Sequence, residues 1–272
     1  MNFLVLLLVA IILRFTPWRG GFPIDVLGFW SDWAARVTQG RSSWLFLLLL
    51  LLPLPLLAGV LWLVTGVAYG VLTLIFHTLL VLLCVGRSDP LGNMASAVGE
   101  AWQRGDHEAA SVLAEQDFGV LADDLTSLVQ GLRARMAAEA CHGYFVPAFW
   151  YVLLGPLVAV AYRLAWLASR RSDTGGHAFA DALAHALEWL PVRLMGLSFA
   201  LVGHFDSTLQ VLKQHLLQWE PRSAELAQIF TTAALTEDPA APAAEPLDAM
   251  RTFLLRAVLV WAVVIAFISL MG

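Results

Sequence analysis

The stretch that decides the fold is WLFLLLLLLPLPLLAGVLWLVTGVAYGVLTLIFHTLLVLLCVG, residues 44–86, which contains no Asp, Glu, Lys or Arg. At about 1.5 Å per residue, one straight helix of this length would be roughly twice as long as the ~30 Å hydrocarbon core of a bilayer. The run therefore predicts a hairpin of two membrane spans, 44–63 and 67–85. The turn is expected within VTGVAYG, residues 64–70, because its glycines favour a change of chain direction.

The composition supports a membrane protein. Of the 272 residues, 59% are hydrophobic and 14% are charged, whereas a soluble domain carries about 25% charged residues. The fold class predicted is all-α: a polytopic integral membrane helical bundle with amphipathic helices beside the membrane. The net charge of −5 argues against nucleic acid as a partner, because phosphate binding needs clustered Lys and Arg. Cys84 and Cys141 show no CxxC spacing and are expected to be packed thiols.

The chain divides into five regions by its apolar and charged runs. Residues 1–85 hold the N-terminal membrane segments, a short one at 2–15 and then the hairpin, and residues 86–142 form an acidic helical region. Residues 143–205 hold further membrane segments, with an intervening polar helix at 172–188. An acidic helical region with a Pro/Ala linker follows over 206–250, and a C-terminal membrane segment over 251–272. The start of the chain lacks the basic region and cleavage pattern of a signal peptide, so segment 2–15 is expected to be retained.

Prolines lie inside two of the predicted spans. Pro53 and Pro55 fall within 44–63 and are expected to kink that helix rather than end it. The uncharged residues 143–162 predict another span, kinked near Pro147 or Pro156.

Arginine counts predict the orientation. Loop 14–43 carries four arginines and is expected in the cytoplasm, because cytoplasmic loops are enriched in Lys and Arg. The hairpin then returns the chain to the cytoplasm, where region 86–142 is expected. The predicted location is the bacterial inner membrane, which the chain would cross several times. The lipid bilayer is therefore an expected partner. Region 86–142 reads as three amphipathic helices, with Asp106 as a helix N-cap. Whether 189–205 spans the membrane stays open.

The stretch HALEWLPVRLMGLSFALVGHF, residues 185–205, places a proline and an arginine in an apolar run. Pro191 is expected in the first turn of a helix, where its missing N–H needs no partner. An arginine at the centre of a bilayer costs about 2.5–3.5 kcal/mol, so Arg193 should face protein or a polar pocket. Its guanidinium needs an anion or several carbonyls, or else an internal pair with Asp181 or Glu188.

Other titratable side chains complete the set of candidate ligand-binding residues. His177, Asp181, His185 and Glu188 form one stripe on a helix, which is either a metal site or, by preference, the wet face of an amphipathic helix. His77 is expected to be hydrogen-bonded within the bundle. No nucleophile elbow or Walker pattern occurs, so we predict no catalytic residue, no metal and no cofactor. The candidate ligand-binding residues are Arg193, Asp181, His185, Glu188, His142 and Asp117.

Three stretches together resemble the AmpE family. They are the short apolar N-terminus that ends at Arg14, GYFVPAFWYVLLGPLVAVAYRL at 143–164, and EWLPVRLMGLSFALVGHF at 188–205. The resemblance implies an inner-membrane protein of Gram-negative bacteria, linked with the AmpD amidase in the system that connects β-lactamase induction to cell-wall recycling. It implies a signalling modulator or sensor component without chemistry of its own. Its expected partners are an anionic cell-wall fragment or lipid and a membrane or cytoplasmic protein.

A more distant resemblance joins the chain to the cobinamide-phosphate synthases. The shared motifs are W-x-P-x-R-L (Trp189, Pro191, Arg193, Leu194), G-D-x-E-A-A (Gly105, Asp106, Glu108, Ala109, Ala110) and P-x-F-[WY] (Pro147, Phe149, Trp150). The synthases carry Glu-Asn-x-Ser-Asp-Gly where this chain has Ala138, Glu139 and His142 at the first, second and fifth positions. Their Gly-Arg-Asp-Thr motif has its nearest counterpart around Asp117, without an arginine. Loss of these acids removes groups that a metal-held nucleotide would need.

Three alternatives remain open at this point. The first is a divergent membrane ligase or transferase of the synthase type, with a reassigned site around Arg193, Asp181, Glu188, His142 and Asp117. The second is a lipid or fragment transporter, in which Pro53, Pro55, Gly66, Pro147 and Pro156 would mark broken helices. The third is a plain structural partner.

Overall fold

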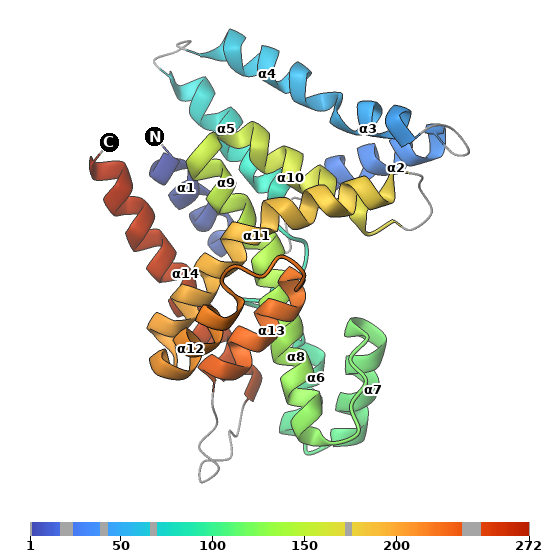
Figure 1. The fold of residues 1–272 in the computed structure, drawn as a ribbon, viewed down its shortest axis with the longest axis vertical. Helices are drawn as coiled ribbons and strands as arrows, with labels where there is room; N and C mark the ends of the chain where they lie inside the picture. The colour runs from blue at the N-terminus through green and yellow to red at the C-terminus, as the bar shows by residue number, and fades with distance from the viewer. Residues whose placement is uncertain are drawn as a thin grey trace. The chain divides into compact units, whose positions relative to one another are not determined.

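The computed structural model describes residues 2–16, 24–38, 43–65, 70–171, 176–235 and 246–271, and every regular element within them is a helix (Figure 1). The prediction of an all-α fold is confirmed for these residues. Contacts group the chain into two units. The first holds Met1–Arg87, Val146–Glu188 and Ile265–Gly272, and the second holds Ser88–Phe145 and Trp189–Val264.

The first unit contains most of the apolar helices. They are α1 (Asn2–Phe15), α2 (Val26–Thr38), α3 (Ser43–Leu51), α4 (Pro53–Val64), α5 (Val71–Cys84), α9 (Val146–Leu154) and α10 (Pro156–Ser169). The second unit contains α6 (Ser96–Gln103), α7 (His107–Phe118), α8 (Leu125–Ala140), the π-helix η3 (Cys141–Phe145), α12 (Phe205–His215) and α13 (Ser223–Ala234). Two long helices, α11 (His177–Val202) and α14 (Pro246–Met271), contribute residues to both units.

Helix α5 is central in the first unit, where it contacts α1, α4, α9 and α10. A hydrogen bond between His77 Nδ1 and the Tyr151 hydroxyl, 3.2 Å long, joins α5 to α9. The Asn2 side-chain amide donates to the carbonyl of Val152 over 3.3 Å and so joins the start of α1 to α9. The prediction that His77 is hydrogen-bonded within the bundle is confirmed.

Within the described residues, two helical segments are long and apolar enough to cross a membrane. They are Ser43–Val64, with 22 residues, and Leu247–Met271, with 25 residues. Three further apolar helices are shorter: Asn2–Phe15, Val71–Cys84 and Pro156–Ser169. The first predicted span of the hairpin is therefore long enough to cross, whereas α5 covers the second span, 67–85, with only 14 residues.

The prolines of the apolar segments act in two different ways. Between α3 and α4, Leu52 keeps helical backbone angles and Ser43–Val64 is one helical segment, so the prediction that Pro53 does not end the helix is confirmed, and the kink itself stays a prediction. At 143–162 the prediction of one kinked helix is wrong. Gly155 has a φ of 88°, which favours glycine, and the chain restarts as α10 with Pro156 in its first turn. This segment is therefore two helices separated by a break.

Region 86–142 forms three helices, as its pattern predicts. Between α6 and α7, Gly105 has a φ of 77° and Asp106 accepts a hydrogen bond of 3.0 Å from the Ala109 N–H, which confirms Asp106 as an N-cap. Asp124 and Ser127 form a capping box at the start of α8. The hydrogen bonds from the Ser127 N–H and hydroxyl hold the pKa of Asp124 below its usual value.

Close approaches between helices hold the second unit together. Helix α13 packs on α8 and α12. A Cβ atom at Gly196 would lie 2.6 Å from the Phe230 ring, and one at Gly203 would lie 2.5 Å from the Ala234 carbonyl oxygen. Since real Cβ atoms do not approach so closely, glycine at these two positions allows α13 to reach the C-terminal half of α11.

Two sequence predictions fall outside the described residues in whole or in large part. The centre of the hairpin turn, residues 66–69, and the Pro/Ala linker, residues 236–245, are not among them. The division into membrane and cytoplasmic regions stays a prediction, because the two units are defined by contacts between residues and not by their position in a membrane.

Candidate functional site

The stretch that combines Pro191 with Arg193 lies within one helix. We predicted a polar helix over 172–188 followed by a separate membrane segment. The structure instead has the single helix α11, His177–Val202, with Pro191 in its interior. The prediction that Pro191 occupies a first helical turn is therefore wrong.

A tryptophan accounts for this interior proline. A proline removes the N–H that would bond to the carbonyl four residues earlier, here that of Leu187. The indole N–H of Trp150, on α9, donates to this carbonyl oxygen over 2.8 Å. Because the donor comes from another helix, α11 continues through Pro191 without leaving the Leu187 carbonyl unsatisfied.

The Arg193 side chain is bound by backbone carbonyls. Only 4% of the residue is exposed. Its Nε donates to Leu216 O over 2.7 Å, and one terminal nitrogen donates to Trp189 O over 2.6 Å. The other terminal nitrogen donates to His215 O over 3.2 Å and to Gln218 O. The guanidinium carbon also lies 4.1 Å from the centroid of the Trp189 ring.

We predicted that the Arg193 guanidinium would bind an anion, several carbonyls, or a carboxylate of Asp181 or Glu188. In the structure it binds several carbonyls. Three of the four acceptors lie at the end of α12 and in the loop that follows it. The last carbonyls of a helix have no partner inside the helix, so the guanidinium caps α12 and satisfies the loop at once. An anion would have to replace some of these carbonyls to reach it. The ligand-binding role of Arg193 stays a prediction.

Of the stripe formed by His177, Asp181, His185 and Glu188, the C-terminal half faces the interior of the first unit. His185 and Glu188 are buried, with 8% and 6% exposed, while His177 and Asp181 are half-buried. The interpretation of this stripe as a wet helix face is therefore wrong for its second half. The burial follows from α9 and α10, which both hydrogen-bond to α11 near Glu188.

Tyr162 and Arg163 add polar groups that the sequence analysis did not include. The Tyr162 hydroxyl donates to the Glu188 carboxylate over 2.9 Å. Arg163 is 5% exposed, and its guanidinium carbon lies 4.4 Å from the centroid of the Trp166 ring. The spacing of Tyr162, Arg163 and Trp166 on one helix is the signal that could have drawn attention to it.

A second polar cluster lies where α8 passes into the π-helix. The buried Glu139 pairs with Arg135 over 2.8 Å and accepts a hydrogen bond of 2.6 Å from the Ser88 hydroxyl. His142 is buried in the π-helix itself. Single π-turns within α-helices are frequent at functional sites. This cluster lies in the stretch that the distant resemblance compares with the acidic signature of the synthases, and its carboxylate is paired with Arg135 and accepts from Ser88.

The six predicted ligand-binding residues do not all belong to one unit. Asp181, His185 and Glu188 lie in the first unit, and Arg193, His142 and Asp117 lie in the second. Asp117 is exposed near the end of α7. In the described part of the chain, no group of three or more His, Cys, Asp and Glu side chains is arranged to hold a metal ion.

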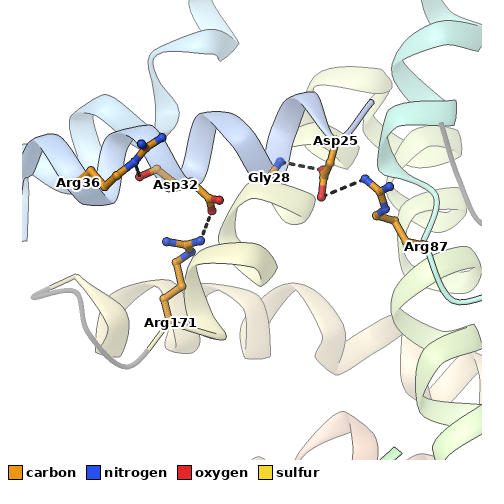
Figure 2. Close-up of polar contacts among 6 residues, drawn as sticks. All are labelled: Asp25, Gly28, Asp32, Arg36, Arg87 and Arg171. Carbon is orange, nitrogen blue, oxygen red and sulfur yellow. Dashed lines mark hydrogen bonds and ion pairs between the residues drawn. The ribbon is translucent and has the colours of Figure 1, made fainter. Parts of the chain in front are cut away.

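Charged side chains also gather around α2 in the first unit, as Figure 2 shows. Asp25, directly before α2, accepts a hydrogen bond of 2.9 Å from the Gly28 N–H and pairs with Arg87 over 3.4 Å. Asp32 pairs with Arg171, which follows α10. These side chains are partly exposed, and they fix α2 against the ends of α5 and α10.

The chain has relatives among known proteins. The family described as "Regulatory signalling modulator protein AmpE" matches residues 1–272. The "Protein AmpE" of Shigella flexneri is 26% identical over 221 residues, which cover 76% of this chain and 77% of that protein. No solved structure matches the chain.

Proposed function

We propose a function from one premise: the chain belongs to the AmpE family of regulatory signalling modulators, whose match covers residues 1–272. The resemblance predicted from the motifs is thereby confirmed. The proposal is that the protein modulates signalling from the bacterial inner membrane, in the response that ties cell-wall recycling to β-lactamase induction. It would do so by binding an anionic ligand or a protein partner, without catalysis.

Exposed apolar surface supports the multi-pass location. Besides the two helical segments long enough to cross a membrane, α4 exposes large side chains along its length, among them Leu56, Trp62 and Leu63. Soluble monomers rarely expose large contiguous apolar patches. A bilayer would cover this surface without a further protein.

The observation that carries the proposal is the buried carboxylate of Glu188, which lies among the apolar helices of the first unit. Ionisable groups are expensive in such surroundings and mark functional sites in membrane proteins. Glu188 is held by Tyr162 and lies one helical turn from His185, and the buried Arg163 follows Tyr162 along α10. We propose that Arg163 and His185 recognise an anionic group, such as that of a cell-wall fragment or lipid, beside Glu188 and Asp181.

The Glu139 cluster supports a role without catalysis. In the synthases, chemistry on a phosphorylated substrate would need carboxylates to hold a metal and nucleotide. Here the Glu139 carboxylate is occupied by Arg135 and Ser88. We therefore expect the purified protein to release no phosphate from ATP with Mg²⁺. Phosphate release that Glu139→Gln abolishes would favour the ligase alternative.

The test uses β-lactamase induction in cells that lack their own AmpE protein. The chain is supplied as the wild type, as Glu188→Gln, and as Glu115→Gln, which alters an exposed carboxylate on α7 in the same way. The glutamine at 188 still accepts the Tyr162 hydrogen bond but carries no charge. We expect the wild type and Glu115→Gln to restore the response to an inducer, and Glu188→Gln to fail at equal protein level in the membrane fraction.

Equal restoration by Glu188→Gln would contradict the proposed site. No change in induction between cells with and without the wild-type chain would contradict the signalling role tied to β-lactamase.

A transporter is the second candidate function, and the break at Gly155 favours it. Transporters bind substrate at discontinuous helices near the middle of the bilayer, and we propose that the break between α9 and α10 would serve as such a point. The release of a cell-wall fragment trapped inside proteoliposomes would favour this function, and retention of that fragment would exclude it.

A further inference from the structure

The loop between α12 and α13 exposes large apolar side chains at its tip. Leu217 is 84% exposed and Trp219 is 54% exposed, and the neighbouring Leu216 is exposed as well. In water this arrangement is unfavourable, since each side chain could be buried at a gain of about 1.5–3 kcal/mol. The loop is therefore built for surroundings other than bulk water.

Three backbone carbonyls at the end of α12 and in this loop are satisfied by protein. The carbonyls of His215, Leu216 and Gln218 all accept hydrogen bonds from Arg193. Gln218 O also accepts from the Trp189 indole N–H over 3.3 Å, and the Trp189 and Trp219 rings stack with their centroids 6.5 Å apart. Irregular backbone enters a membrane only where its polar groups are satisfied by protein. Three carbonyls meet that condition: His215 O at the end of α12, and Leu216 O and Gln218 O in the loop.

An exposed apolar stripe on α11 leads to the loop. Its members recur at helical spacing on one side of the helix: Leu190, Leu194, Leu197 and Leu201. The Trp261 indole N–H donates to the Ser198 hydroxyl over 2.9 Å, which sets α14 beside this part of α11. Helix α14 contains one of the two candidate membrane spans. The stripe is therefore continuous with the surface that the proposed bilayer would cover.

The charges beside the loop suit anionic headgroups. Lys213, His215 and Arg222 flank the tip, with Glu220 as the acid among them. The loop between α7 and α8 differs in this respect. The exposed fraction of its Leu121, 78%, is similar to that of Leu217. The charged residues near Leu121 in the sequence are, however, Asp117, Asp123 and Asp124. The two loops thus match in apolar exposure and differ in charge.

From these observations we propose that the loop 216–219 and the exposed stripe of α11 insert into the headgroup region of a bilayer that contains anionic lipid, with Leu217 and Trp219 as anchors. This inference rests on the proposed membrane location and adds a specific contact to it. Trp is favoured at this depth because its ring is apolar and its N–H is polar. Arg193 makes the insertion feasible because it satisfies the loop carbonyls.

The test measures the depth of single positions in the full-length protein. Leu217→Cys is made in a Cys84→Ala, Cys141→Ala background and labelled with an environment-sensitive fluorophore. Leu121→Cys is the matched control, and Leu259→Cys, an exposed position on α14, reports insertion of the protein itself. The proteins are reconstituted in vesicles of phosphatidylethanolamine and phosphatidylglycerol with a nitroxide on the lipid chains. We expect a blue-shifted emission and quenching by the nitroxide at 217 and 259, but at 121 the emission of a label in water.

The outcomes separate the inference from the membrane proposal. Quenching at 259 with a label in water at 217 overturns the inference and leaves the membrane location standing. A label in water at both positions overturns both. A label at 217 that is shielded in native membranes but not in pure lipid vesicles also overturns the inference, since a protein then covers the loop.

A variant links the insertion to Arg193. Arg193→Lys keeps the charge but offers a single point donor in place of a planar fork, so fewer of the loop carbonyls are satisfied. We expect a red shift and weaker quenching at 217, with the signal at 259 unchanged. If the variant does not fold, Trp219→Ala removes one anchor without altering the carbonyl bonds and is expected to weaken the quenching at 217. Full quenching at 217 in either folded variant contradicts the proposed anchoring.

Discussion

Arg193 and Arg171 are bound in two different ways within one chain. Arg193 is 4% exposed and donates to four backbone carbonyls. Arg171 has 30% of its side chain exposed and pairs with one carboxylate, that of Asp32, which is 48% exposed (Figure 2). Water solvates the surface pair from outside. The buried guanidinium has lost that water and needs a protein acceptor for almost every N–H group.

The comparison teaches that the stabilising effect of a charge depends on what remains when it is removed. Loss of Arg171 leaves an aspartate that water can solvate. Loss of Arg193 leaves the carbonyls of His215 and Leu216 without this donor, at about 1–3 kcal/mol each where they are buried, while Gln218 O keeps the Trp189 indole N–H. The two arginines should therefore differ strongly in mutational effect.

The largest effect is expected for Arg193→Met. This variant keeps much of the side-chain volume but removes the donor of the His215 and Leu216 carbonyls, so the free energy of unfolding should fall by about 3–5 kcal/mol. Thermal unfolding in detergent, followed by tryptophan fluorescence, measures the loss. A change as small as that of Arg171→Met would show that the carbonyl bonds contribute little.

The next largest effect is expected for Glu139→Ala, which lies between the two extremes because Glu139 is buried but Arg135 is partly exposed. The variant removes the ion pair and the acceptor of the Ser88 hydroxyl, and should lower the free energy of unfolding by about 2–3 kcal/mol. The Ser88→Ala, Glu139→Ala double variant should lose less than the sum of the two single losses. Strict additivity in this cycle would mean that the two side chains do not interact.

A smaller loss is expected for Trp150→Phe, which removes the donor to the Leu187 carbonyl. Because Pro191 leaves that carbonyl without a helix partner, the free energy of unfolding should fall by about 1–2 kcal/mol. In a Pro191→Ala background the helix supplies its own N–H, so the same substitution should cost less. An equal cost in both backgrounds would refute the proposed compensation.

The smallest effect is expected for Arg171→Met. Exposed ion pairs contribute about 0–1 kcal/mol and are screened by salt. The difference from wild type, measured by the same unfolding assay, should shrink further between low and high salt. A loss that exceeds 2 kcal/mol and persists in high salt would mean that the Asp32 pair acts as a buried one.

The sequence predicts those features whose cause is local. The uncharged run at 44–86 indicates a long apolar segment, and Asp106 caps a helix because its own side chain reaches the next turn. Gly155 was missed as a helix break, although a glycine directly before Pro156 is a local signal for one.

The rest depends on partners far along the chain. Pro191 sits inside a helix because Trp150, 41 residues earlier, supplies the missing donor. Three of the four carbonyls that bind Arg193 lie 22 to 25 residues later in the chain. The stripe on α11 turns inward because α9 and α10 cover Glu188. Helical periodicity shows that such residues share a face, but not what packs against that face.

The central proposal is that the chain crosses the membrane repeatedly, with the hairpin formed by α3, α4 and α5 as its first pair of spans. It is tested most directly by labelling single cysteines, in the background without Cys84 and Cys141, with a membrane-impermeant maleimide in spheroplasts and in inverted vesicles. The account predicts that Leu63→Cys reacts from the outside, whereas Ser43→Cys and Leu121→Cys react only from the cytoplasmic side. Reaction of all three from the same side would contradict it.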